Sequence, residues 1–257
     1  MSSNETPFPR PFEAPSDLLA GRNVLITGAS GGLGKALAIE CARVGARVIV
    51  SGRNLKKLES VCDEIERLKA PSPAIAVVDL AAATAVEYDM LAKTVADEFG
   101  RLDGLVHAAA LLGDRTPLEQ YDVPTWCRVL HVNLTAPFIL TQVLLPSLRR
   151  SEDASVIFVS SGVVTRPRPF WGAYAVSKSG LEAVRAMLAE ELESTGVRVN
   201  SVNPGRLRTP MRAAAYPAED PRTVPAPQSV TGAFLYLLSA QSRGIDGRCI
   251  EAQTAGA

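Results

Sequence analysis

The chain has 257 residues, 47% of them hydrophobic, and its 27 acidic and 27 basic side chains leave no formal net charge. This balance argues against a nucleic-acid partner, because such proteins usually carry a basic face. No apolar run approaches the ~20 residues that span a bilayer, and the N-terminal sequence lacks the apolar core of a secretory signal. We therefore expect a soluble, cytoplasmic protein without a membrane partner.

The four cysteines stand far apart in the sequence, at Cys41, Cys62, Cys127 and Cys249. None of them belongs to a CxxC or Cys/His cluster, so the sequence predicts neither a metal site nor a redox pair. We expect reduced, packed thiols, as in an intracellular protein.

Residues 1–17 are polar and rich in proline, which predicts an N-terminal arm that is disordered or lies on the surface. From residue 18 onward no break in composition divides the chain, so we expect one domain. Its short apolar runs are typical of strands buried on both faces of a parallel sheet. The runs cover residues 24–27, 48–51, 75–79, 105–108, 156–160, 197–202 and 248–251.

The stretches between these runs carry apolar residues at every third or fourth position, which indicates amphipathic helices. Such stripes begin at Leu33, Tyr88 and Ser177. Strands that alternate with helices predict right-handed βαβ units and a doubly wound α/β fold. Residues 206–228 contain much proline and alanine and interrupt the alternation, so we expect a lid-like insertion there, built as a loop or a short helix pair.

A glycine-rich turn follows the first predicted strand, with the sequence Thr27-Gly28-Ala29-Ser30-Gly31-Gly32-Leu33-Gly34. Between a strand and a helix, such a turn lets the backbone approach a pyrophosphate, to which the helix N-terminus presents its N–H groups and its dipole. An ordinary tight turn is the alternative. A P-loop is not indicated, because Ala29 and Ala36 occupy the positions of its first glycine and its metal-binding hydroxyl residue.

The second predicted strand ends in Ser51-Gly52-Arg53-Asn54, without the acidic residue that binds the ribose of NAD. The guanidinium of Arg53 would instead pair with the 2′-phosphate of NADP, unless Arg53 is an ordinary solvated arginine. We predict NADP(H) as the cofactor in preference to NAD(H). NADPH should bind at least about ten-fold more tightly than NADH, a margin of about 1.4 kcal/mol.

Tyr174 and Lys178 lie one turn apart on the same face of a predicted helix. The ordinary tyrosine pKa of about 10 is too high for a base at neutral pH. An ammonium at ~4 Å would favour the phenolate by about 4 kcal/mol, which is enough to lower that pKa to near neutrality. A functional role for the Tyr174 and Lys178 pair is favoured further because Ser160-Ser161-Gly162 lies at the end of a predicted strand, a short loop before the pair.

Pro137 lies four residues after Asn133 in a predicted helical stretch. Proline lacks the N–H that would bond the Asn133 carbonyl in an α-helix. This pattern predicts one of two features: a simple kink, or a carbonyl free to accept a hydrogen bond from a water that leads from Lys178 to bulk solvent.

Together these motifs resemble the short-chain dehydrogenase/reductase superfamily over residues 20–252. The matching motifs are Thr27-Gly28-xxx-Gly32-x-Gly34, Asn133, Ser161, Tyr174-xxx-Lys178 and Asn203-Pro204-Gly205. Within the superfamily, Leu111-Leu112-Gly113-Asp114, Trp171-Gly172-Ala173-Tyr174 and Met211-Arg212-Ala213 resemble the YciK-like oxidoreductases. The resemblance implies a Rossmann-type fold with seven parallel strands, in one catalytic domain over residues 18–257.

The resemblance also implies a catalytic role for four residues. Tyr174 would be the general acid/base, and Lys178 would lower its pKa and hold the nicotinamide ribose. Ser161 would bond the substrate oxygen, and Asn133 would hold a relay water through its main chain. The residues implied in cofactor binding are Gly28, Ser30, Gly32, Leu33, Gly34, Arg53, Asp79, Leu80, Ala108, Ala109, Tyr174, Lys178, Pro204, Gly205 and Thr209.

The sequence departs from the family pattern after the fourth predicted strand, where His107-Ala108-Ala109-Ala110 replaces Asn-Asn-Ala-Gly. The asparagine that ties neighbouring strands is absent, and Ala110 adds a methyl group that would alter the affinity or the pose of the cofactor. His107 and His131 are expected to be structural. Phe170, Trp171 and the nearby Arg166 and Arg168 either wall the substrate pocket or form an ordinary surface.

The predicted activity is hydride transfer between a nicotinamide and a small-molecule carbonyl or alcohol, with Tyr174 exchanging the proton and Ser161 polarising the carbonyl. The main alternative is a cofactor sensor or scaffold without catalysis, which only the altered segment 107–110 favours. A methyltransferase is a weaker alternative, because it does not need the Tyr174 and Lys178 pair.

The sequence does not identify the substrate. Segments 111–115, 166–171 and 206–228 would select it, and they mix apolar with basic side chains. They permit a hydrophobic ketone, an acidic ketone or an acyl thioester. The resemblance implies a homodimer or homotetramer whose interface includes the helices that contain Asn133 and Tyr174.

Overall fold

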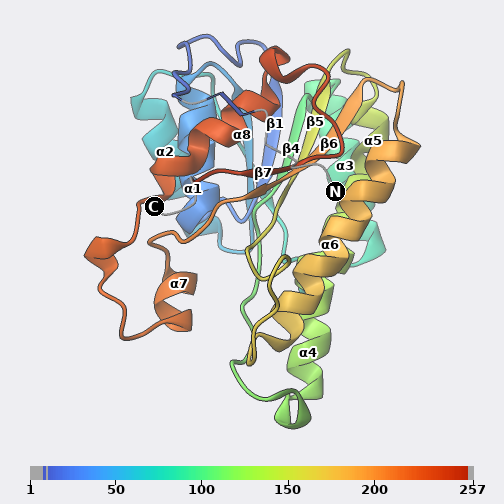
Figure 1. The fold of residues 1–257 in the computed structure, drawn as a ribbon. Helices are drawn as coiled ribbons and strands as arrows, with labels where there is room; N and C mark the ends of the chain where they lie inside the picture. The colour runs from blue at the N-terminus through green and yellow to red at the C-terminus, as the bar shows by residue number, and fades with distance from the viewer. Residues whose placement is uncertain (1–7, 10, 254–257) are drawn as a thin grey trace.

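Seven parallel strands form one sheet in the computed structural model, which describes residues 8–9 and 11–253 (Figure 1). The strand order is β3-β2-β1-β4-β5-β6-β7, so the chain starts in the middle of the sheet and winds outward twice. The strands are β1 (Asn23–Thr27), β2 (Arg47–Gly52), β3 (Ala74–Val77), β4 (Gly104–His107), β5 (Ala154–Val159), β6 (Val197–Asn203) and β7 (Cys249–Glu251). The predicted doubly wound fold is confirmed, and each predicted strand is present with small shifts of its bounds.

Helices cover both faces of the sheet (Figure 1). On one face lie α1 (Gly32–Arg43), α2 (Leu55–Arg67) and α8 (Thr231–Leu238), packed against side chains such as Ile26 and Val50. On the other face lie α3 (Ala85–Phe99), α5 (Ala136–Leu148) and α6 (Gly172–Glu191), packed against Leu25 and Phe158. Successive strand residues point to opposite faces, so each continuous apolar run supplies both core layers.

Strand β3 differs from the prediction that all apolar runs are buried on both faces. Ile75 and Val77 are 37% and 53% exposed, whereas Ala74 and Ala76 pack against the core. β3 is an edge strand with a neighbour on one side only, so one row of its side chains remains in contact with solvent.

One long helical rod contains α4 (Val123–Leu130), the π-helical turn η2 (His131–Thr135) and α5. Pro137 cannot supply the N–H of a regular α-helical bond to Asn133, and the predicted irregularity takes the form of this wider turn, a feature frequent at functional sites. By length and composition Val123–Leu148 could cross a membrane, but 44% of its most apolar window is buried inside the protein. The core helix of a soluble protein meets the same criteria.

Three of the remaining short elements lie in or at the end of the lid-like insertion predicted for residues 206–228. This segment contains α7 (Pro210–Ala215), η3 (Pro221–Thr223) and the start of η4 (Pro227–Val230). Two other 3₁₀ turns, η1 (Leu118–Gln120) and η5 (Ala240–Ser242), lie elsewhere in the chain.

The N-terminal arm was predicted over residues 1–17, of which 1–7 and 10 lie outside the described residues. The rest of the arm lies against α8. The rings of Phe8 and Phe12 stand 5.8 and 5.5 Å from the Tyr236 ring, centre to centre. Near the other end of the chain, Gln253 Nε2 donates to the carbonyls of Pro204 and Arg206.

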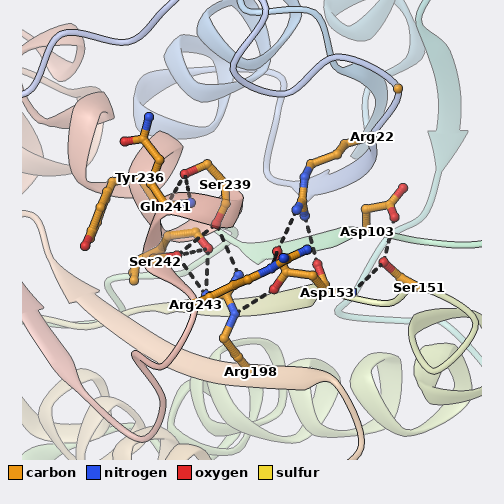
Figure 2. Close-up of polar contacts among 12 residues, drawn as sticks. Arg22, Asp103, Ser151, Asp153, Arg198, Tyr236, Ser239, Gln241, Ser242 and Arg243 are labelled. Atoms are coloured by element: carbon orange, nitrogen blue, oxygen red, sulfur yellow. Dashed lines mark hydrogen bonds and ion pairs between the residues drawn. The ribbon is translucent and has the colours of Figure 1, made fainter.

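A buried ion-pair network joins the amino-terminal ends of the central strands (Figure 2). Asp153, just before β5, accepts from Arg22 Nη2 at 2.7 Å and from Arg198 Nε of β6 at 2.9 Å. Arg198 Nη1 also donates to Ser242 Oγ at 2.8 Å. Burial raises the pKa of the Asp153 carboxyl, but Arg198 and Arg22 outweigh this effect and hold the pKa below its ordinary value.

Replacing Asp153 by Asn should destabilise the fold by about 3 kcal/mol at neutral pH, because it leaves two largely buried guanidinium groups without their carboxylate. Since the folded-state pKa is the lower one, the carboxylate's contribution is present above the unfolded pKa of about 3.9. It is lost as pH falls through the folded pKa. Urea unfolding of wild type and D153N at neutral and acidic pH would measure both effects.

The exposed pair Lys93–Asp97 offers a matched control, because its two side chains are 77% and 61% exposed. Asp97→Asn should change the free energy of unfolding by less than about 1 kcal/mol. If D153N were no more harmful than D97N, the network would not be a determinant of stability.

Candidate active site

The residues predicted to bind the cofactor and to act in catalysis gather at one cleft of about 540 Å³. It lies at the carboxyl ends of the strands, where doubly wound sheets bind their ligands. The predicted residues that line it are Gly28, Ser30, Gly32, Leu33, Gly34, Arg53, Asp79, Leu80, Ala108, Ala109, Ser161, Tyr174, Lys178, Pro204, Gly205 and Thr209. Asn133 alone of the predicted set is not in the lining, because it is buried beside it.

The glycine turn between β1 and α1 forms one wall of this cleft. Gly28 has a φ of +67°, and a Cβ there would lie 2.8 Å from backbone atoms of Ala109. Gly34 packs against the Gly28 carbonyl, where a Cβ would collide. α1 starts at Gly32 and directs its N-terminal N–H groups into the space that the turn leaves open. This geometry suits a phosphate group.

Two further predicted residues lie where β2 and β3 end. Arg53 directly follows β2, and its exposed side chain lines the cleft. Asp79 was predicted to end a strand but lies in the turn after β3, where its Oδ1 accepts from the Ala81 N–H at 3.1 Å. The turn fixes Asp79 and Leu80 along the same rim as Arg53.

The proton-handling residues come from the end of β5 and the start of α6. Lys178 is 2% exposed, and its Nζ donates to the Val159 carbonyl at 2.7 Å. The same Nζ lies 5.8 Å from the centre of the Tyr174 ring. Tyr174 is 8% exposed, and the Ser161 side chain lies near enough to its phenol to lower the pKa of Tyr174. The structure therefore brings Ser161, Tyr174 and Lys178 together.

The pKa values in this trio differ from the sequence-based expectation. Burial raises the pKa of Tyr174, and Ser161 lowers it only in part. Burial also lowers the pKa of Lys178 to about 8, with Glu182 acting in the opposite direction. A lowering of the Tyr174 pKa by Lys178 is not seen here, because desolvation of the phenol dominates and the ammonium donates to the Val159 carbonyl. The role predicted for Lys178 toward Tyr174 stays a prediction.

Asn133 uses its side chain in a way that the sequence did not predict. Its Oδ1 accepts from the Leu111 N–H at 2.7 Å, and its Nδ2 donates to the Leu111 carbonyl at 2.8 Å. Nδ2 also donates to Ser177 Oγ at 3.1 Å. The Asn133 amide therefore clamps the loop after β4 to α6, while the role predicted for its main chain stays a prediction.

Comparison with known proteins agrees with this geometry. The family model described as short chain dehydrogenase matches residues 22–220. The chain belongs to this family. Short-chain dehydrogenases are oxidoreductases that use a nicotinamide dinucleotide, so the predicted superfamily and the general class of activity are confirmed.

Individual relatives of this short-chain dehydrogenase cover nearly its whole length. It is 40% identical to the uncharacterized oxidoreductase YciK of Escherichia coli K12, over 94% of this chain and 96% of that protein. A structure described as a short chain dehydrogenase from Pseudomonas syringae matches with a TM-score of 0.93 and 48% identity, over 94% and 98% of the two chains. One from Shigella flexneri 2a, complexed with NADP, has a TM-score of 0.91 and 40% identity over 93% and 99%. The predicted YciK-like branch is confirmed.

In the segment 107–110, which departs from the family pattern, His107 connects two elements of the fold. His107 is 1% exposed, its ring stacks on Phe158 at 4.9 Å, and its Nε2 is 2.9 Å from Thr141 Oγ1. Because Thr141 Oγ1 donates to the Pro137 carbonyl, His107 Nε2 is the donor to Thr141. Burial, and secondarily Lys178, lower the pKa of His107 to about 3, so the imidazole is neutral. It ties β4 to α5 in place of the family's asparagine.

Sequence analysis left open whether residues 166–171 wall the substrate pocket or form an ordinary surface. In this short-chain dehydrogenase some of them do the first and others the second. Trp171 lines the cleft, and its ring stands 5.6 Å from the Tyr174 ring. Phe170 is 50% exposed, and Arg166 and Arg168 are also exposed. Tyr216 and Arg115 join Trp171, and all three residues come from the segments predicted to select the substrate, although the sequence did not predict these particular contacts.

Replacing Asn133 by Leu should lower the free energy of unfolding by about 2 kcal/mol, because both backbone groups of Leu111 lose their partner in a partly buried place. Leucine keeps a similar volume and the main-chain carbonyl. Ser177→Ala is the matched control, since it leaves Leu111 bound to Asn133. Chemical denaturation of the two variants should show the larger loss for N133L, and equal losses would contradict the clamp.

Proposed function

We propose that this short-chain dehydrogenase is an NADP(H)-dependent carbonyl reductase or alcohol dehydrogenase. The observation that carries the proposal is the trio that lines the cleft together: Ser161, Tyr174 and Lys178, with the Lys178 ammonium 5.8 Å from the centre of the phenol ring. The cleft leads from this trio to the glycine turn and Arg53. It therefore offers a place for both ends of a dinucleotide.

The residues of the cleft fit NADP(H). The glycine turn leaves room for a pyrophosphate, since a Cβ at Gly31 would meet nothing within 4 Å. Arg53 would pair with the 2′-phosphate, and Lys178 would donate to the nicotinamide ribose. The NADP complex of the Shigella flexneri protein supports the same cofactor. When bound, the cofactor supplies or accepts a hydride at nicotinamide C4.

In this proposal Ser161 and Tyr174 hold the substrate oxygen and polarise the carbonyl. Tyr174 gives its proton to that oxygen during reduction and removes it during oxidation. Lys178 stabilises the phenolate that remains and orients the ribose. Burial raises the pKa of Tyr174, so the phenol holds its proton, and this is the form that donates during reduction.

The segment 206–228 would act as a lid over the bound molecules. Thr209 caps α7 by accepting from the Arg212 N–H, and its methyl carbon lies 3.4 Å from where a Cβ on Gly32 would be. α7 thus reaches across to the glycine turn. Closure of such a lid excludes water from the reacting groups.

Tyr174→Phe should reduce ketone turnover by about 10³-fold, because it removes the proton donor, while NADPH still binds. Loss of NADPH absorbance with a panel of ketones would measure turnover, and calorimetry would measure cofactor binding. Tyr88→Phe is the control, because Tyr88 is buried elsewhere and its hydroxyl has no partner among the described residues. Full turnover in Y174F would refute the mechanism, and wild-type protein that binds NADPH without oxidising it would favour a sensor.

Arg53→Ala should weaken NADPH binding by about ten-fold or more and leave NADH binding unchanged, because only NADPH carries the 2′-phosphate. Fluorescence titration with both cofactors would measure the preference. Arg67→Ala, at the far end of α2 and outside the cleft, is the matched loss of one exposed positive charge. A preference that survives in R53A would overturn the assignment of Arg53.

A further inference from the structure

An arginine without a carboxylate partner among the described residues, Arg115, stacks on Trp171, which lines the cleft beside Tyr174. Arg115 Cζ lies 4.4 Å from the centre of the Trp171 ring and 5.3 Å from that of Tyr216. Its Nη1 donates to the Ala215 carbonyl at 2.7 Å. The neighbouring Arg212 differs, because Nε and Nη2 both bond the Glu219 carboxylate at 2.7 Å. Glu219 thus neutralises Arg212, whereas the charge of Arg115 stays available.

The loop that carries Arg115 is held at several points. Asn133 binds both backbone groups of Leu111, and the Asp114 N–H donates to the Tyr121 hydroxyl at 3.1 Å. Gly113 has a φ of +70°, and a Cβ there would collide with the Tyr121 hydroxyl. A guanidinium on such a loop is positioned before any ligand arrives, which reduces the entropy that binding costs.

The side chains between Arg115 and Tyr174 are apolar. Trp171 lies between them, 4.4 Å from the guanidinium and 5.6 Å from the phenol ring. Leu112 and Met211 pack beside Trp171 against the same cluster as Tyr174. A molecule whose carbonyl lies at Tyr174 would therefore extend past the Trp171 ring to reach the Arg115 guanidinium.

We propose that the substrate is an anionic carbonyl compound, with a flat apolar body against Trp171 and a carboxylate that pairs with Arg115. The inference rests on the proposed function for the position of the reacting carbonyl. A guanidinium matches a carboxylate with two parallel hydrogen bonds, and stacking on aromatic rings leaves its edge free to make them. In the proposed substrate, about the width of one ring separates the carboxylate from the carbonyl. A compound in which these two groups are adjacent is too short to reach Arg115 and Tyr174 together.

The test uses para-acetylbenzoate and its methyl ester, which share ketone, ring and shape but differ in charge. Calorimetry in the presence of NADP⁺ measures binding, and loss of NADPH absorbance measures kcat and KM separately. The wild type should bind the acid about ten-fold more tightly than the ester, the gain expected of one charge-assisted pair. Arg115→Gln should abolish this difference by weakening the acid alone, and Arg115→Lys should retain part of it.

The control is Arg222→Gln, which removes an equal charge from the lid at a side chain that is 89% exposed and paired with Asp220. It should leave the preference for the acid unchanged. An acid that binds no more tightly than the ester, absence of binding included, overturns the inference. So does an R115Q variant that loses affinity for acid and ester alike, because Arg115 would then only fasten α7 through Ala215. These results concern binding, so they remain separate from a failure of turnover, which would count against the proposed function.

Discussion

The arrangement of Ser161, Tyr174 and Lys178 depends on one buried charge. The Lys178 ammonium has little contact with solvent, and a buried charge is costly unless polar groups surround it. The Val159 carbonyl, at the last residue of β5, accepts its hydrogen bond at 2.7 Å. Ser161 follows two residues later, so the same stretch of backbone holds the Lys178 ammonium and carries the Ser161 hydroxyl. The bond between α6 and β5 therefore links Lys178 to the segment that bears Ser161.

Asn133 extends this arrangement to the substrate end. Its amide joins Leu111, in the loop after β4, to Ser177, whose hydroxyl donates to the Tyr174 carbonyl at 2.8 Å. The amide belongs to the π-helical turn His131–Thr135, where Pro137 cannot supply the N–H of an α-helical bond to Asn133. The bonds of this amide connect the loop that bears Arg115 with the helix that carries Tyr174.

The sequence predicts the sheet well and the surroundings of the site less well, for physical reasons. Apolar runs and a glycine turn are local patterns, so the strands and the wall formed by Gly28 and Gly34 follow from them. The edge position of β3 depends on the strand order, which local patterns do not specify. The pKa of Tyr174 depends on desolvation, which only the packed structure reveals. Trp171, Arg115 and Tyr216 come from three separate segments, and no spacing rule connects them.

Arginines stand at both ends of the parallel strands, and the two groups differ in their partners. At the amino-terminal ends of the strands, Arg22 and Arg198 share the carboxylate of Asp153 and are thereby neutralised. At the carboxyl ends, Arg53 follows β2 and Arg115 follows β4, and neither pairs with a carboxylate among the described residues. A positive charge that the protein does not neutralise is available to an anion from outside. Arg53 lines the cleft, and Arg115 stacks on Trp171, which lines the same cleft. In the proposals above the two arginines would draw in two anionic groups, one on the cofactor and one on the substrate, and hold the reacting atoms between them.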